Sequence, residues 1–88
     1  LVYGAGNAGR QIVSALDGSN KMRVVGFIDD DPLLHGQILK GHTIYSSEDL
    51  RSLINSKKVT HILLALPSLN RNIRNKILKK INKYKIFN

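Results

Sequence analysis

A glycine-rich turn near the start of the chain constrains the fold more than any other feature of the sequence. Residues 4–9 read Gly-Ala-Gly-Asn-Ala-Gly, which fits the pattern G-x-G-x-x-G. The apolar residues Leu1 to Tyr3 before the turn are typical of the end of a buried strand, and apolar residues at helical spacing follow it. This strand–turn–helix order predicts the first unit of a Rossmann-like fold.

The rest of the chain alternates apolar runs with amphipathic segments. The runs at residues 24–28 and 60–66 are typical of strands that are covered on both faces. Helical spacing follows Ser46, which with Asp49 resembles a capping box, while residues 33–45 indicate a small hairpin or an extended excursion. Because strands that alternate with helices form parallel sheets, we expect an α/β fold, a Rossmann-like three-layer α/β/α domain with a parallel sheet.

The length of 88 residues corresponds to a single domain, residues 1–88, or to a piece of one. The chain begins at Leu1 and ends on residues that read like the start of a strand, so we expect a fragment of a larger protein, truncated at both ends. It contains no Cys, which excludes disulfides and thiolate metal sites. No apolar run approaches the roughly 20 residues that cross a bilayer, and we expect the fragment to be soluble and cytoplasmic.

Each glycine of the turn has a role in nucleotide binding. Gly4 would allow the tight turn, Gly6 would let the backbone approach a pyrophosphate, and Gly9 would let the helix pack against the strand. The first-turn amides would face the phosphates at the positive end of the helix dipole. The candidate phosphate-binding residues are therefore Gly4, Ala5, Gly6, Asn7, Ala8, Gly9 and Arg10. A turn that serves only the fold, with an empty site and a solvated Arg10, stays open as the alternative.

An acidic corner follows the second predicted strand. Asp29 lies 20 residues beyond Gly9, where a carboxylate can accept hydrogen bonds from both ribose hydroxyls and repel a 2′-phosphate. This favours NAD over NADP as the cofactor. Successive residues of an extended chain point to opposite sides, so Asp29 and Asp30 are the candidates, while Asp31 with Pro32 suits a turn.

Two further candidates follow the strand that is predicted to end at Leu66. Pro67 and Ser68 would lie at the carboxyl edge of the sheet, where open α/β sheets bind ligands. Either residue could touch the nucleotide. The alternative is that Pro67 only ends the strand and Ser68 only caps the last helix.

The sequence indicates no catalytic residue and no metal site in this chain. No Tyr is followed four residues on by Lys, so the Tyr/Lys pair of short-chain oxidoreductases is absent, and no Ser/His/Asp set is evident. The histidines His35, His42 and His61 show no metal-ligand spacing and read as surface or loop residues.

The net charge of +8 is unevenly distributed. Residues 1–44 carry four basic and four acidic residues, whereas residues 45–88 carry ten basic and two acidic ones. The last predicted helix contributes six cations and no acid: Arg71, Arg74, Lys76, Lys79, Lys80 and Lys83. Such a helix can lie on anionic lipid, or it can present a solvated outer face over an apolar stripe. No aromatic residues are interleaved to stack bases, so we expect no nucleic-acid partner.

Three stretches taken together resemble a known family of domains. Residues 2–11, residues 25–32 with Gly36 after them, and residues 62–68 resemble the first Rossmann-like domain of bacterial polysaccharide-biosynthesis proteins. These are nucleotide-sugar 4,6-dehydratases, epimerases and 4-dehydrogenases, including those that act on UDP-quinovosamine-type sugars. The resemblance implies an NAD-type nucleotide-binding module that is not catalytic alone.

The same resemblance implies a parent protein with transmembrane helices before this domain and a separate catalytic domain after it. The parent would be an oxidoreductase, lyase or epimerase at the bacterial inner membrane, with this domain on the cytoplasmic side. Its implied partners are the nucleotide ligand, the catalytic domain of the parent chain and the inner-membrane surface. A homo-oligomer stays open.

A second resemblance competes for the ligand. The glycine turn followed by residues 27–31, Phe-Ile-Asp-Asp-Asp, is similar to the N-terminal domain of sugar acyltransferases, where the comparable pocket holds a UDP-sugar. Similar domains also bind coenzyme A. A UDP-sugar, CoA or an empty site in a structural domain therefore stand as alternatives to NAD.

Overall fold

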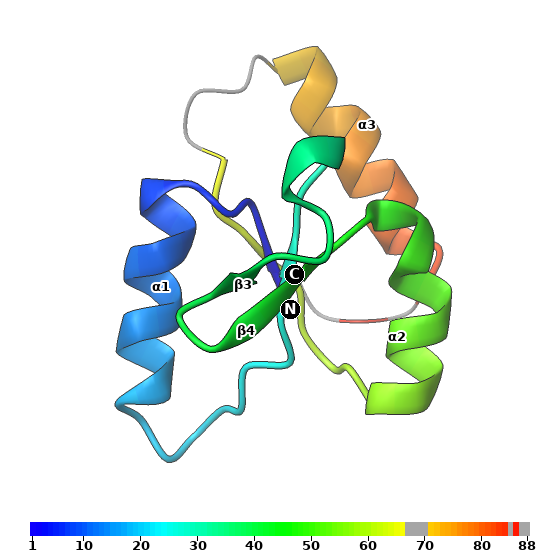
Figure 1. Cartoon of the computed structure of the whole chain (residues 1–88). Helices are drawn as coiled ribbons and strands as arrows, with labels where there is room; N and C mark the ends of the chain where they lie inside the picture. The colour runs from blue at the N-terminus through cyan, green and yellow to red at the C-terminus, as the bar shows by residue number, and fades with distance from the viewer. Residues whose placement is uncertain (67–70, 85, 87–88) are drawn as a thin grey trace.

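The computed structural model describes residues 1–66, 71–84 and 86. Figure 1 shows a sheet with helices on both sides. The strands are β1 (Val2–Tyr3), β2 (Phe27–Ile28), β3 (Ile38–Leu39), β4 (His42–Tyr45) and β5 (Leu63–Leu64). The helices are α1 (Asn7–Asp17), α2 (Leu50–Lys57) and α3 (Arg71–Asn82), with 3₁₀ turns η1 (Pro32–Leu34) and η2 (Ser47–Asp49).

The strands form one sheet in the order β3-β4-β2-β1-β5. β1 pairs in parallel with both β2 and β5, and β4 continues the parallel sheet on the far side of β2. The edge strand β3 runs antiparallel to β4, and their turn takes Lys40 and Gly41 through positive φ, as a tight hairpin requires. The predicted parallel sheet is confirmed, and the ambiguous excursion is a hairpin.

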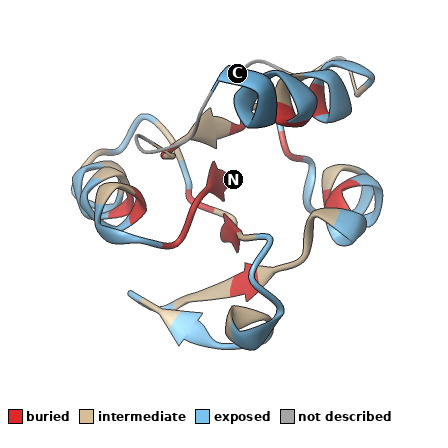
Figure 2. Cartoon of the chain, turned by 90° about the horizontal axis from the view of Figure 1, so that it is seen from above, coloured by how far each residue is buried: buried red, intermediate tan, exposed pale blue. Residues whose placement is uncertain are grey.

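The sheet lies between α1 on one side and α2 with α3 on the other, as Figure 2 shows. Side chains alternate along each strand, so Val2 and Phe27 pack with Val13 of α1, whereas Tyr3 and Ile28 pack in the cluster beneath α2 and α3. Both clusters are apolar, which explains why the strands read as continuous hydrophobic runs. The predicted three-layer α/β/α architecture is confirmed.

Several predicted boundaries differ from the structure. The regular strands β2 and β5 are shorter than the apolar runs 24–28 and 60–66. The prediction of a capping box at Ser46 and Asp49 is wrong. Ser46 Oγ accepts from the Glu48 amide at 3.2 Å and therefore caps η2, and the Asp49 side chain makes no capping hydrogen bond to α2. The predicted N-cap Ser68 lies outside the described residues.

None of the helices in the described part of the chain combines the length and the apolar character that a bilayer crossing requires.

Candidate functional site

The strand order creates a crevice at the carboxyl edge of the sheet. From β1 the chain crosses through α1 to β2 on one side, while β5 lies on the other side, so the topology switches direction between β1 and β5. Ligands of open α/β sheets bind outside the strand ends at such a switch point. The glycine turn follows β1, Asp29 and Asp30 follow β2, and Leu66 follows β5. Pro67 and Ser68 lie outside the described residues.

Gly4 and Gly9 are required by the fold itself. Gly4 has φ +119, and a Cβ there would lie 2.5 Å from the backbone oxygen of Ala65, the residue after β5. A Cβ on Gly9 would overlap the Gly4 carbonyl oxygen, because helix α1 crosses directly over the end of β1. Both glycines therefore have a structural reason that does not involve a ligand.

The packing of the fold does not require a glycine at position 6. Its φ of −87 and ψ of −161 are open to any residue, and a Cβ there would meet nothing within 4 Å. Gly6 is the N-cap of α1 and supplies no side-chain cap, although Ser, Thr, Asn or Asp would stabilise the helix at this position. The space over the middle of the turn is therefore left open.

The first-turn amides of α1 face this open space. The Gly6 carbonyl accepts the first helical hydrogen bond, from Arg10 N at 3.0 Å. The amides of Asn7 and Ala8 come before that bond in the helix, and they donate no hydrogen bond to any of the described residues. They lie at the positive end of the helix dipole, which favours an anion. The side chain of Arg10 is exposed on the first turn.

Asp29 lies directly against the glycine turn. Its Oδ2 accepts from the Ala5 amide at 2.9 Å, and its Oδ1 accepts from the Asp31 amide at 2.9 Å. Each carboxylate oxygen keeps lone-pair capacity for a further donor. The carboxylate thus lies at the end of β2, against the turn residue that precedes Gly6.

His35 supports this corner, a contact that sequence reasoning missed. Its Nε2 lies 2.6 Å from the backbone oxygen of Asp29, so this nitrogen carries the proton and donates it. The bond ties the segment after η1 back to the end of β2. No sequence signal indicates it, because His35 reaches Asp29 only through the turn that Pro32 begins.

Asp30 and Asp31 point to other partners. The Oδ2 of Asp30 accepts from the Tyr3 hydroxyl at 2.8 Å, on the side of the sheet that α3 covers. The Oδ1 of Asp31 accepts from the Leu33 amide at 3.0 Å and caps η1, which confirms the predicted turn role. Asp30 borders an apolar cavity of about 260 Å³, lined by Tyr3, Asp29, Asp30, Leu66, Ile73 and Ile77.

The buried Tyr3 hydroxyl makes stability depend on alkaline pH. Burial raises the pKa of Tyr3, and the hydrogen bond to Asp30 and its charge raise it further. Above the ordinary tyrosine pKa of about 10 the unfolded chain loses this proton while the folded chain keeps it, so stability falls as pH rises. Above pH 10 we expect the unfolding free energy of the wild type to fall by up to about 1.4 kcal/mol per pH unit more than that of Tyr3→Phe, which has no proton to lose. Urea titrations at a series of pH values measure the two slopes. Equal slopes for both proteins would contradict this account.

A second crevice opens between α1 and α3 over β5. It has a volume of about 290 Å³ and is lined by Ala8, Ile12, Leu64, Ala65, Leu66, Arg74 and Ile77. Ala8 belongs to the glycine turn, so the crevice continues from the first turn of α1 towards α3. Sequence reasoning missed Arg74 here and grouped it with the outer cations. The available signal is its spacing, three residues before the buried Ile77.

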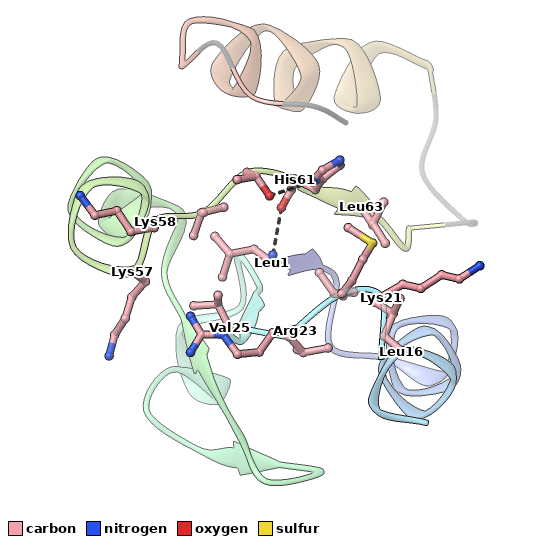
Figure 3. Close-up of a pocket in the computed structure, with 14 residues that line it drawn as sticks. Leu1, Leu16, Lys21, Arg23, Val25, Lys57, Lys58, His61 and Leu63 are labelled. Carbon is pink, nitrogen blue, oxygen red and sulfur yellow. Dashed lines mark hydrogen bonds between the residues drawn. The ribbon is translucent and has the colours of Figure 1, made fainter. Parts of the chain in front are cut away.

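A third pocket lies at the opposite, amino-terminal edge of the strands (Figure 3). It has a volume of about 250 Å³. Four cations line it, Lys21, Arg23, Lys57 and Lys58, and the Leu1 nitrogen donates to the His61 backbone oxygen at 3.0 Å within it. None of the predicted site residues that the structure describes lines this pocket.

The fold and the carboxyl edge define a Rossmann-like α/β domain. The chain belongs to the C2185-like, N-terminal family, whose model matches residues 1–87. Among curated protein sequences, none matches the chain at a significant level.

Two crystal structures share the fold over 97% of this chain. UDP-D-quinovosamine 4-dehydrogenase from Vibrio fischeri is 33% identical, with a TM-score of 0.93 over 70% of its chain. RSP, a Rex-family repressor, is 20% identical, with a TM-score of 0.78 over 40% of its chain. The predicted resemblance to nucleotide-sugar enzymes is thus confirmed in part, by the dehydrogenase.

Proposed function

We propose that this domain binds a nucleotide, NAD in the first place, at the carboxyl edge of its sheet. In this proposal it is a non-catalytic module of a nucleotide-sugar-modifying enzyme, a dehydratase, epimerase or 4-dehydrogenase of bacterial surface-polysaccharide biosynthesis. The enzyme class is supported by the 33% identity to a UDP-D-quinovosamine 4-dehydrogenase.

The observation that carries the proposal is the open space at Gly6. The protein's own packing explains Gly4 and Gly9 but gives no reason for a glycine between them. In a glycine-rich turn of this kind, the middle glycine lets a pyrophosphate approach the backbone. A bound ligand therefore accounts for the one glycine of this turn that the fold leaves unexplained.

The neighbouring groups suit the parts of a dinucleotide. A pyrophosphate over Gly6 would take the amides of Asn7 and Ala8, which have no acceptor among the described residues. The adjacent ribose would donate to the free lone pairs of Asp29, and the charge there would disfavour a 2′-phosphate. The base would enter the apolar cavity beside Leu66 and Ile73.

A nucleotide sugar is the second candidate ligand. The substrate named for the 33% identical dehydrogenase is a UDP-sugar, and such a ligand carries the same ribose and diphosphate groups as NAD. The two candidates are distinguished by direct titration.

The test is ligand-induced stabilisation of the wild type and of Gly6→Val. We expect NAD to raise the Tm of the wild type and to bind at least about tenfold more weakly to Gly6→Val, since a side chain would fill the phosphate position. Titrations with NAD, NADP, UDP-N-acetylglucosamine and CoA, by thermal shift and calorimetry, identify the ligand.

The matched control is Gly18→Val at the other end of α1. A Cβ there would make only ordinary contacts, 3.7 Å from the nearest backbone oxygens. This variant should bind like the wild type. Equal binding by Gly6→Val and wild type would argue against the site, and no Tm shift with any of the four ligands would favour a structural domain with an empty site.

A further inference from the structure

The crevice between α1 and α3 brings a cation to the end of the proposed nucleotide site. Arg74 lines it from α3, and Ala8, in the first turn of α1, lines it from the opposite side. Asp29 lies at the other end of the edge, beyond Gly6 and next to Ala5. A carboxylate, free amides and a guanidinium thus follow one another along the carboxyl edge.

No carboxylate in the described part of the chain pairs with Arg74. Within the described residues the ion pair joins His42 of β4 to Asp17 at the end of α1. No hydrogen bond among these residues involves the Arg74 side chain. The walls beside it are apolar, formed by Ile12 and Leu66 among others.

This order matches the order of groups in a nucleoside diphosphate ester. The ribose would lie at Asp29 after β2, the first phosphate over the turn after β1, and the second phosphate in the crevice over β5 that Arg74 lines. A guanidinium is suited to that second phosphate because its planar donors can bind two phosphate oxygens at once. The other α3 cations do not line this crevice.

We infer that Arg74 binds the phosphate of a diphosphate ligand that lies farther from the ribose at Asp29. The inference rests on the proposed function and extends it. The diphosphate is common to NAD and to UDP-sugars, so Arg74 selects for a second phosphate whichever of the two ligands binds.

The test compares Arg74→Gln with Lys76→Gln. Both remove one exposed positive charge from α3, but Lys76 lines neither the crevice nor the cavity. We expect Arg74→Gln to weaken NAD or UDP-N-acetylglucosamine binding about tenfold, the loss of one charge-assisted contact, and to leave AMP binding within about twofold. Lys76→Gln should stay within about twofold for every ligand, and Arg74→Lys should restore part of the affinity.

The outcomes separate the two proposals. If the wild type binds NAD or UDP-N-acetylglucosamine but Arg74→Gln and Lys76→Gln behave alike, the role of Arg74 is overturned and the nucleotide site stands. If Arg74→Gln weakens AMP as much as the diphosphate ligands, the residue does not act on the second phosphate. If the wild type binds none of the nucleotides, both proposals fail. Unchanged Tm values of the unliganded variants confirm that neither substitution affects folding.

Discussion

Replacing Gly9 with alanine is expected to destabilise the domain by about 3 kcal/mol or more. The added Cβ would overlap the carbonyl oxygen of Gly4, and neither atom can rotate away, because the oxygen belongs to the backbone and the backbone fixes the position of the Cβ. Helix α1 would have to move off the end of β1, which also separates Val13 from Val2 and Phe27 in the core. Small domains have only about 5–15 kcal/mol of stability, so a large share would be lost.

Gly6→Ala is the matched control for this prediction. It makes the same chemical change three residues earlier, where a Cβ would meet nothing within 4 Å. Its cost should stay within about 1 kcal/mol, the range of an N-cap effect. Urea unfolding followed by circular dichroism measures both variants. A loss for Gly9→Ala no larger than that for Gly6→Ala would show that α1 does not cross β1 as closely as described.

Ile81→Ala is expected to cost about 2–5 kcal/mol, as truncations of fully buried aliphatic side chains do. Ile81 has 0% exposure and packs from α3 into the cluster with Leu50 and Ile62. This contact places the apolar stripe of α3 in the core beneath the helix, while its cations lie on the outer face.

Ile73→Ala provides the comparison on the same helix. Ile73 is 43% exposed, so its truncation should cost about 1 kcal/mol or less. The same urea titrations apply to both variants. Equal and small losses would mean that α3 does not dock on the sheet in solution.

The order of elements was predictable because it depends on local patterns. The glycine turn, the helical spacing around Val13 and the apolar runs each indicate one element without reference to the rest of the chain. The strand order was not predictable in this way. Ile44 pairs with Phe27 across β2 and β4, and the hairpin pattern of residues 33–45 does not say that one of its strands joins the parallel sheet.

The residues of the candidate site were also predictable only where their positions depend on local sequence patterns. The position of Asp29 beside the turn follows from the spacing to Gly9, and the structure has it there, 2.9 Å from the Ala5 amide. The partners of Asp30 and His35 depend on how Tyr3 and η1 are placed in three dimensions, which no spacing encodes. Arg74 was hidden among the other cations of its helix, because only the approach of α1 to α3 distinguishes it.

The separation of the layers also separates the charge. The basic excess of residues 45–88 belongs to the part of the chain that forms α2 and α3, whereas the half that forms α1 and β2 is neutral overall. The molecule therefore carries a permanent electric asymmetry, and a phosphorylated ligand that binds as proposed would be captured faster because of this field. Capture of such a ligand should accordingly slow as added salt shortens the reach of that field.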